Sequence, residues 1–408
     1  MELAAYQLSA LRSLLKAVVP ANGFYARKLA GVDLEIGSVA EFVARVPVTT
    51  KEELAEDHEE NPPYGTTHTL PLERYNRFHQ TSGTRGKPLI WMDDPEGWDW
   101  VLGNWEAVWR GAGARAGDCA FFPFSFGPFL GFWGGFEAAA RMGVRAVPGG
   151  GLSSEDRLRL LQRCDANFVC CTPTYALRLA EVGEAIGMPV GEMGVERFIV
   201  CGEPGGSIPE VRERIESAWR ARVFDHHGMT EIGPVTVSDE DNPDWLRLLH
   251  YSYLVEVIDT GTLASVPMGE VGELVLTTLG RFGAPLLRYR TGDLVRPVET
   301  ETPGAFALDG GIIGRADDMV VVRGVNLYPS AVEAVVRGAG VTGEYRVEVD
   351  ERKSLPEIRM QVEGDAELVS ALEKELRATF SMRIPVEAVA PRSLPVFEVK
   401  AKRWVVVR

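Results

Sequence analysis

The feature that most constrains the fold of this chain is an alternation of short apolar runs with helical segments between residues 119 and 225. Strands that alternate with helices at this spacing form βαβ units, and their strands assemble into a mostly parallel sheet. In such a sheet, ligands bind in the loops that follow the carboxyl ends of the strands. The predicted strands cover residues 119–124, 144–148, 166–172, 198–201 and 222–225, and the predicted helices include 154–163, 175–186 and 209–219.

The regions on both sides of this alternation show other patterns. With 408 residues the chain is too long for one ordinary hydrophobic core, so two or more domains are expected. Residues 1–78 are predicted to be helices joined by short loops, and a tryptophan-rich helix is predicted over 98–110. After about residue 250, three predicted strands follow one another without helices, at 254–258, 272–278 and 286–290, which indicates a small antiparallel or barrel-like region.

A polar, glycine-bearing junction at residues 313–319 marks the predicted domain boundary. Beyond it the pattern predicts a strand over 320–322, a helix from about residue 330, a hairpin over 345–362 and a helix over 366–381. We therefore predict an α/β fold with two domains. A large N-terminal domain over 1–315 holds mostly parallel βαβ sheets plus a small barrel-like β region, and a small α+β domain follows over 316–408.

The charge balance limits the partners. The net charge of −15, from 43 lysines and arginines against 58 aspartates and glutamates, argues against binding to nucleic acid or to an anionic membrane. The five cysteines form no C-x-x-C motif, which indicates reduced thiols in a cytoplasmic protein. No stretch approaches the roughly 18 apolar residues of a membrane span, and the N-terminal segment lacks the marks of a signal peptide.

Residues 79–88, His-Gln-Thr-Ser-Gly-Thr-Arg-Gly-Lys-Pro, are the strongest candidate for binding phosphate. Glycines let the backbone approach a ligand closely, and hydroxyls, backbone N–H groups and a lysine suit a polyphosphate. The segment is not a P-loop, because only two residues separate its glycines and proline follows its lysine. A mobile surface loop of the same composition is the alternative. The candidate phosphate ligands are Thr81, Ser82, Gly83, Thr84, Gly86 and Lys87.

Three more polar clusters each follow a predicted strand. Residues 201–206 form a glycine-rich turn, which an ordinary strand-to-helix connection would also explain. In residues 225–231 two adjacent histidines point to opposite sides of an extended segment, so we expect a ring beside a nucleotide base rather than a metal pair. Glu231 is suited to hold Mg²⁺ together with phosphate oxygens. Asp293, at the end of the third cluster, is suited to the two hydroxyls of a ribose; ordinary solvated carboxylates are the alternative for both.

Taken in order, these clusters resemble the motifs of adenylate-forming enzymes of the acyl-CoA synthetase superfamily, in particular phenylacetate-CoA ligases. The resemblance covers nearly the whole chain, and the leading segment 14–54 also resembles the phenylacetate branch. Its motifs lie at residues 81–88, 201–204, 227–231, 289–293, 314–329 and 400–403.

The resemblance implies an enzyme that joins a carboxylic acid to ATP in the presence of Mg²⁺, releases pyrophosphate, and transfers the acyl group to coenzyme A. The 81–88 loop would bind the β- and γ-phosphates, Thr230 would contact a phosphate, and Glu231 would be the magnesium ligand. The other residues that the resemblance places around ATP are Gly202, Glu203, Pro204, His227, Gly228, Met229, Asp293 and Arg315.

The resemblance also implies a mobile C-terminal domain that rotates about Asp317 between the two half-reactions. Lys400 would bridge the carboxylate and the α-phosphate during adenylation, where positive charge stabilises developing negative charge. Together with Thr230 and Glu231 it would form the catalytic set. Lys402 is the competing candidate, and a solvated basic tail is the alternative for both lysines.

The substrate is expected to be an aryl or arylacetic acid, because aromatic walls suit a planar ring. Such rings are also common in ordinary cores. The pocket positions that the resemblance implies are Phe124, Phe126, Phe129, Trp133 and Gly202.

This sequence departs from the family pattern at two places: Val399 stands where glycine is usual before the lysine, and His227 stands where tyrosine is usual beside adenine. Two alternatives therefore stay open. One is an adenylating enzyme that passes the acyl group to an amine or to a carrier-protein thiol. The other is a nucleotide-binding protein without catalysis. Because no cysteine lies between residues 232 and 250, we expect no second metal site there; the resemblance also suggests a homodimer.

Overall fold

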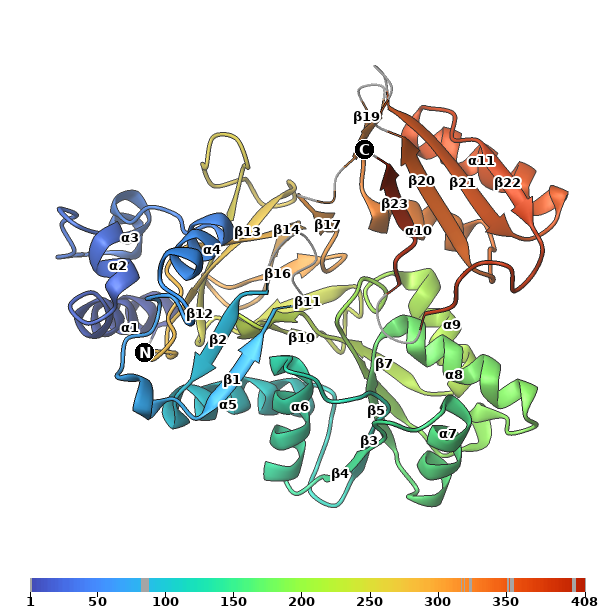
Figure 1. The fold of residues 1–408 in the computed structure, drawn as a ribbon, viewed down its shortest axis with the longest axis horizontal. Helices are drawn as coiled ribbons and strands as arrows, with labels where there is room; N and C mark the ends of the chain where they lie inside the picture. The colour runs from blue at the N-terminus through green and yellow to red at the C-terminus, as the bar shows by residue number, and fades with distance from the viewer. Residues whose placement is uncertain are drawn as a thin grey trace.

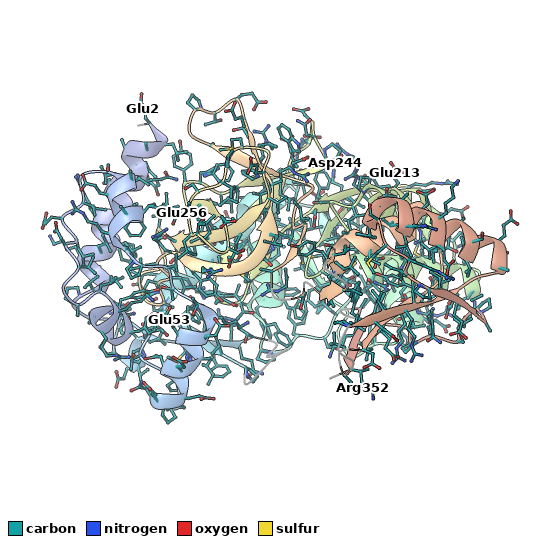
Figure 2. All side chains as sticks on the ribbon, turned by 90° about the horizontal axis from the view of Figure 1, so that it is seen from above. Glu2, Glu53, Glu213, Asp244, Glu256 and Arg352 are labelled. Carbon is teal, nitrogen blue, oxygen red and sulfur yellow. The ribbon has the colours of Figure 1, made fainter. Side chains whose placement is uncertain are left out.

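The computed structural model describes residues 2–81, 88–316, 318, 320–322, 325–350, 352, 356–397 and 401–407. The larger part, blue to light orange in Figure 1, contains a parallel sheet and two four-stranded antiparallel ones, and a smaller α+β part, dark orange to red, lies beside it. Figure 2 shows Glu2 at one end of the molecule and Arg352 in the C-terminal part toward the other. The predicted fold class is confirmed. In the part of the chain that the structure describes, no helix is both long and apolar enough to span a bilayer.

A five-stranded parallel sheet forms the centre of the larger part. Successive side chains point to opposite faces, so Phe121 packs in the hydrophobic cluster on one face and Phe122 in the cluster on the other. A strand that is buried on both faces is a continuous apolar run, which is why the sequence identified these strands. In spatial order they are β4 (Arg145–Pro148), β3 (Cys119–Phe122), β5 (Phe168–Cys171), β6 (Arg197–Val200) and β7 (Arg222–Asp225).

Helices cover both faces of this sheet (Figure 1). Three of them, α7 (Ser154–Arg163), α8 (Pro173–Ala185) and α9 (Pro209–Trp219), bury apolar side chains against the Phe121 face. Two others, α5 (Pro95–Gly111) and α6 (Leu130–Arg141), cover the Phe122 face. The α8 helix begins two residues earlier than predicted, because Pro173 suits the first helical position and Thr172 caps it by accepting the N–H of Tyr175.

The N-terminal region is helical, as predicted. It consists of α1 (Leu3–Val18), α2 (Gly23–Lys28), α3 (Val39–Arg45), α4 (Lys51–Glu60) and the 3-10 turn η1 (Leu72–Arg74). Thr50 caps the start of α4: its side chain and that of Glu53 satisfy each other's backbone N–H groups. The antiparallel hairpin β1 (Arg77–Gln80) and β2 (Ile90–Asp93) then brackets the candidate phosphate loop.

Two four-stranded antiparallel sheets follow the parallel one. One has the order β12 (Tyr253–Ile258), β13 (Gly272–Thr278), β14 (Tyr289–Val295) and β17 (Gly314–Arg315). The other has the order β10 (Thr236–Ser238), β11 (Trp245–Leu248), β16 (Phe306–Asp309) and β15 (Pro297–Glu299). Short elements complete the part: η2 (Val190–Glu192), β8 (Gly228–Met229) and β9 (Gly233–Pro234).

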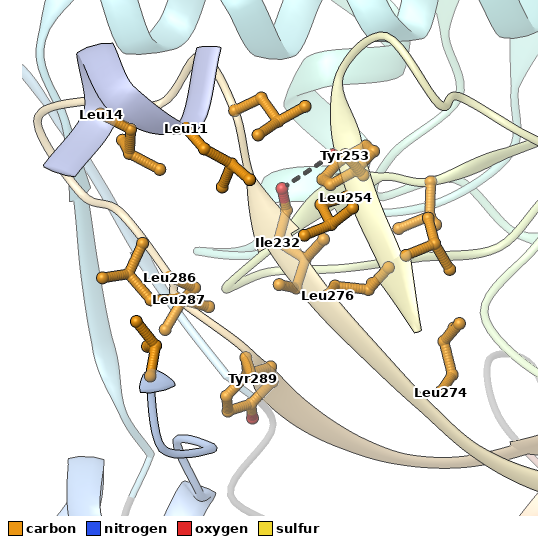
Figure 3. Packing of buried hydrophobic residues seen from close by; sticks show 14 of the residues in the cluster. Leu11, Leu14, Ile232, Tyr253, Leu254, Leu274, Leu276, Leu286, Leu287 and Tyr289 are labelled. Atoms are coloured by element: carbon orange, nitrogen blue, oxygen red, sulfur yellow. Dashed lines mark hydrogen bonds between the residues drawn. The ribbon is translucent and has the colours of Figure 1, made fainter. Parts of the chain in front are cut away.

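The predicted strand over 286–290 is wrong in its bounds. Leu286 and Leu287 are apolar because they pack in the same hydrophobic core as Leu11 and Leu14 of α1 (Figure 3), not because they belong to a strand. Arg288, with φ 46°, turns the backbone out of the extended region, so β14 starts only at the next residue.

The C-terminal part has its own hydrophobic core. It holds the hairpin β18 (Val320–Val322) and β19 (Val325–Leu327), the helices α10 (Pro329–Gly338) and α11 (Ala366–Phe380), and a four-stranded sheet. The order of that sheet is β22 (Val386–Val389), β21 (Glu357–Glu363), β20 (Tyr345–Asp350) and β23 (Trp404–Val407). The hairpin predicted over 345–362 is β20 with β21, whereas β23, which pairs in parallel with β20, was not predicted.

Candidate active site

His227, Asp293 and Arg315 come together at the ligand-binding end of the parallel sheet. His227 follows β7, and its Nε2 lies 3.2 Å from Asp293 Oδ2. Asp293 on β14 and Arg315 on β17 are register partners, and Arg315 Nη1 donates to Asp293 Oδ1 at 2.9 Å. Burial acts to raise the pKa of Asp293, but the charges of His227 and Arg315 and a hydrogen bond hold it below its ordinary value. Asp293 is therefore an anion, as an acceptor for ribose hydroxyls should be.

The two adjacent histidines do point to different partners. His226 is buried, its Nδ1 lies 2.9 Å from the carbonyl oxygen of Thr236, and its ring packs on Trp105 with the centroids 4.5 Å apart. Because a carbonyl only accepts, Nδ1 carries the proton. His227 faces the candidate site instead. This division follows from the extended backbone after β7.

Glu231 is held from three sides. Its Oε1 accepts the hydroxyl of Tyr289 at 3.0 Å and lies 3.9 Å from Lys51 Nζ, and its backbone carbonyl accepts Arg281 Nη1 at 2.8 Å. Magnesium is commonly bound through one or two carboxylates plus substrate phosphates. A buried, oriented carboxylate beside a lysine fits that ion when ATP is present. Thr230, half-buried, directly precedes it, and Gly228 and Met229 form the short strand β8.

Lys51 was missed as a site residue from the sequence. It falls in the region 1–78 that was predicted only to be helical, and it is the first residue of α4. A signal was present, however, because a cation in the first turn opposes the helix dipole and so calls for another role. In the fold, the side chain of Lys51 is about half exposed and reaches toward Glu231.

The candidate phosphate loop is closed at its base. Thr81 donates its backbone N–H to the carbonyl of Leu89 at 2.9 Å, and Leu89 N–H donates to Thr81 Oγ1 at 3.0 Å. Thr81 is buried. The other predicted phosphate ligands, Ser82, Gly83, Thr84, Gly86 and Lys87, lie outside the described residues.

The glycine-rich turn after β6 contacts the C-terminal part. Gly202 has φ 91°, a conformation that favours glycine, and it places Glu203 between two backbone donors. Glu203 Oε1 accepts the N–H of Thr174 at 2.8 Å, and its Oε2 accepts the N–H of Ala401 at 3.0 Å. Burial raises the pKa of Glu203 although these bonds oppose the rise. Pro204 is exposed.

Ala401 lies in the motif that carries both candidate lysines. Lys400 itself and Asp317, the predicted hinge, lie outside the described residues, while Lys402 is exposed. The described neighbour of Lys400 therefore touches the turn after β6, at the same end of the sheet as the other predicted residues.

The predicted acyl-pocket rings form one aromatic cluster after β3. Phe124 stacks on Phe132 with the centroids 4.3 Å apart, and Phe129 meets Phe132 edge-on at 5.9 Å. Phe126 packs against Trp133 at 4.8 Å, and Trp133 is 38% exposed. The cluster is tied to the phosphate loop, because the backbone N–H of Gln80 donates to the carbonyl of Pro128 at 2.7 Å.

Comparisons with known proteins agree with this geometry. A family model described as AMP-binding enzyme matches residues 44–282, and one described as AMP-binding enzyme C-terminal domain matches 324–408. A phenylacetate-coenzyme A ligase of Thermus thermophilus is 33% identical over 372 residues, which cover 89% of this chain and 81% of that protein.

One solved protein, 2-hydroxyisobutyryl-CoA ligase, has structures in several states, of which two are compared with this chain. In the postadenylation state with 2-HIB-AMP it matches with a TM-score of 0.93 at 29% identity, over 98% of this chain and 89% of its own. In the thioesterification state with 2-HIB-AMP and CoA, over the same shares of the two chains, the TM-score is 0.74. The arrangement of the two parts in this chain is thus more similar to the postadenylation structure than to the thioesterification structure. The motifs, the fold and these matches lead to one conclusion: the chain belongs to the AMP-binding enzyme family.

Proposed function

We propose that this protein is an ATP- and Mg²⁺-dependent acid-CoA ligase that activates an aryl or arylacetic acid as its acyl-adenylate. The observation that carries the proposal is the meeting of His227, Asp293, Glu231 and the segment after Lys400 at one end of the parallel sheet. Relatives named phenylacetate-coenzyme A ligase support the choice of acid and of acceptor.

In the proposed reaction a carboxylate oxygen attacks the α-phosphorus of ATP. The bond between the α-phosphorus and the bridging oxygen breaks, and pyrophosphate leaves. The thiolate of CoA then attacks the acyl carbonyl, forms a thioester, and AMP leaves. Lys400 stabilises the negative charge that develops in the first step. Asp293 orients the ribose through its 2′- and 3′-hydroxyls, with Arg315 holding the carboxylate in place.

Magnesium supplies charge neutralisation at the phosphates when it is bound. Glu231 would hold it, while the hydrogen bond from Tyr289 fixes the orientation of the carboxylate. The 81–88 loop and Thr230 bind the phosphates in this proposal, and Gly202, Glu203, Pro204, His227, Gly228 and Met229 surround the adenine. The boundary near residue 315, the hinge at Asp317, a homodimer and a cytoplasmic location belong to the same proposal.

The proposed acid is aromatic because of the ring cluster around Phe124. Offset and edge-on rings are the arrangement in which another planar ring packs favourably. The proposed pocket also includes Phe126, Phe129 and Trp133, and Gly202 forms its floor because glycine has no side chain. A small branched hydroxy acid is the competing substrate, since a structural relative at 29% identity is a 2-hydroxyisobutyryl-CoA ligase.

The test is an acid panel in a pyrophosphate-release assay with ATP and Mg²⁺, run with and without CoA. Phenylacetate, benzoate and substituted aryl acids should give acid-dependent release, and a thioester should appear only with CoA. If 2-hydroxyisobutyrate were the only acid that gave pyrophosphate release, the substrate would be a small hydroxy acid and not an aryl acid. Acyl transfer to an amine substrate or to a phosphopantetheinyl carrier protein in preference to CoA would show that the acceptor is not CoA. Tight ATP binding without release on any acid would favour a non-catalytic protein.

A further inference from the structure

The carboxylate of Glu203 joins the two parts of the chain. One oxygen accepts the N–H of Thr174 in the first turn of α8, and the other accepts the N–H of Ala401. Ala401 directly follows Lys400 in the sequence. A single half-buried side chain therefore links the ligand-binding end of the parallel sheet to the segment that carries the proposed catalytic lysine.

Two residues further on, the same segment is fixed to the C-terminal part. Arg403 Nε donates to Glu344 at 2.8 Å, its guanidinium also lies 3.3 Å from a carboxylate oxygen of Glu333, and it covers the ring of Tyr345 at 5.3 Å. The carbonyl of Arg403 accepts the backbone N–H of Val347 at 2.8 Å. The segment is thus attached to both parts of the chain. Ala401 is bound to Glu203 of the larger part, and Arg403 is bound to Glu344 of the smaller part.

A rotation of the C-terminal part affects these two attachments differently. The contacts of Arg403 lie within the rotating part and move with it. The contact of Ala401 with Glu203 crosses between the parts, so a rotation has to break it. Because a charged acceptor forms a stronger hydrogen bond than a neutral one, this contact favours the arrangement in which it is made.

Resting on the function proposed above, we infer that Glu203 is a positioning residue for the adenylation half-reaction. It holds the backbone beside Lys400 against the ligand site while the acid is activated, and it releases that backbone before the acyl group passes to CoA. This role differs from contact with adenine, because it acts on the protein chain itself.

Two substitutions remove the contact from opposite sides. Glu203→Ala removes the acceptor, and Ala401→Pro removes the donor, because proline has no N–H. Each should lower acid-dependent ATP–pyrophosphate exchange by about 10- to 100-fold, the effect of one charged hydrogen bond. In Ala401→Pro, which keeps the Glu203 side chain, thioester formation from a supplied acyl-adenylate and CoA should stay within about twofold of the unaltered protein. Exchange in the double variant should be no slower than in the more impaired single variant, because both substitutions remove the same hydrogen bond between Glu203 and Ala401.

The matched control is Glu184→Ala, which removes an exposed carboxylate from α8, the helix whose Thr174 N–H Glu203 accepts, and should change neither half-reaction. Glu203→Gln keeps one acceptor oxygen, so its rate of ATP–pyrophosphate exchange should lie between those of the unaltered protein and Glu203→Ala. Equal losses in both half-reactions in Ala401→Pro, or additive losses in the double variant, would overturn the inference.

A second measurement does not depend on catalysis. In the full chain without substrates, trypsin should cleave at Lys400 and Lys402 several times faster in Glu203→Ala than in the unaltered protein, because the backbone there has lost its attachment. An unchanged cleavage rate would overturn the inference. If the unaltered protein shows no acid-dependent exchange at all, the proposed function fails, while the trypsin comparison still decides whether Glu203 holds the segment.

Discussion

Arg281 and Asp93 form a bidentate ion pair inside the larger part, and both residues are fully shielded from solvent. Arg281 Nε and Nη2 each lie 2.6 Å from a carboxylate oxygen of Asp93. The remaining nitrogen, Nη1, donates to the backbone carbonyl of Glu231. The pair therefore connects the strand that follows the candidate phosphate loop to the proposed magnesium ligand.

Breaking this pair from one side should be severely destabilising. Asp93→Asn leaves the guanidinium of Arg281 buried without a counter-charge, and we expect a loss of about 3–5 kcal/mol in the free energy of unfolding in urea. The control is Arg296→Met, which breaks an exposed pair with Asp309 and should cost at most about 1 kcal/mol. Comparable losses in the two variants would contradict the buried role of the pair.

His226 should make the protein sensitive to mild acid. Burial, together with the charge of His227, lowers the pKa of His226 from 6.5 to about 4, although its hydrogen bond to Thr236 opposes the shift. The unfolded chain then binds the proton more readily, so the contribution of His226 to stability is complete above about pH 6.5 and is lost as the pH falls toward 4. Between pH 7 and pH 5 this loss amounts to about 2 kcal/mol.

The measurement is urea unfolding of the unaltered protein and of His226→Asn at both pH values. The amide nitrogen of asparagine can replace Nδ1 as the donor to Thr236 but does not titrate. The variant should therefore lose less stability between pH 7 and pH 5 than the unaltered protein. Identical losses would show that another group titrates instead.

Prediction of the strands from the sequence was most accurate where burial on both faces gives a strand a continuous apolar run. Strands such as β3 and β5 are apolar on both faces, and both were found within one or two residues at their ends. The apolar pair Leu286 and Leu287 misled the prediction of β14, because burial in a core does not distinguish a strand from a tight connection. The real strand includes Gly292 and Asp293, whose residue types suggest a turn.

The candidate site shows the same division. His227, Glu231 and Asp293 were proposed from their places after predicted strands, and the fold brings them to one end of the sheet. The contact of Glu203 with Ala401 had no local mark, because the two residues are far apart in the sequence and the donor is a backbone group that every residue but proline carries.

The two lysines of the terminal motif should separate cleanly. Lys400→Ala should abolish acid-dependent pyrophosphate release yet spare thioester formation from a supplied acyl-adenylate, because only the first step develops charge at the α-phosphate. Lys402→Ala, which alters an exposed side chain, should leave both steps within about twofold of the unaltered protein. A larger loss of pyrophosphate release in Lys402→Ala would transfer the catalytic role to Lys402.

Lys51→Ala should weaken binding of MgATP without unfolding the protein. The lysine side chain is about half exposed, so its pair with Glu231 should contribute no more than about 1 kcal/mol to folding. As a cation beside the proposed magnesium ligand it should help bind phosphate, and we expect the KM for MgATP to rise by about tenfold. Glu52→Ala, an exposed neighbour on α4, is the control. A KM that is unchanged in Lys51→Ala would place the phosphates elsewhere.

The parallel pairing of β23 with β20 has a consequence for the order in which the protein becomes active. These strands are distant in the sequence, and pairings of that kind form late in folding because a long loop must close first. Until they pair, the segment that begins at Ala401 has no fixed place, although the nucleotide-binding end of the larger sheet can already exist. Under the proposed function, a chain in which β23 has not yet paired with β20 would bind ATP at the larger sheet but would lack the placed segment that adenylation needs.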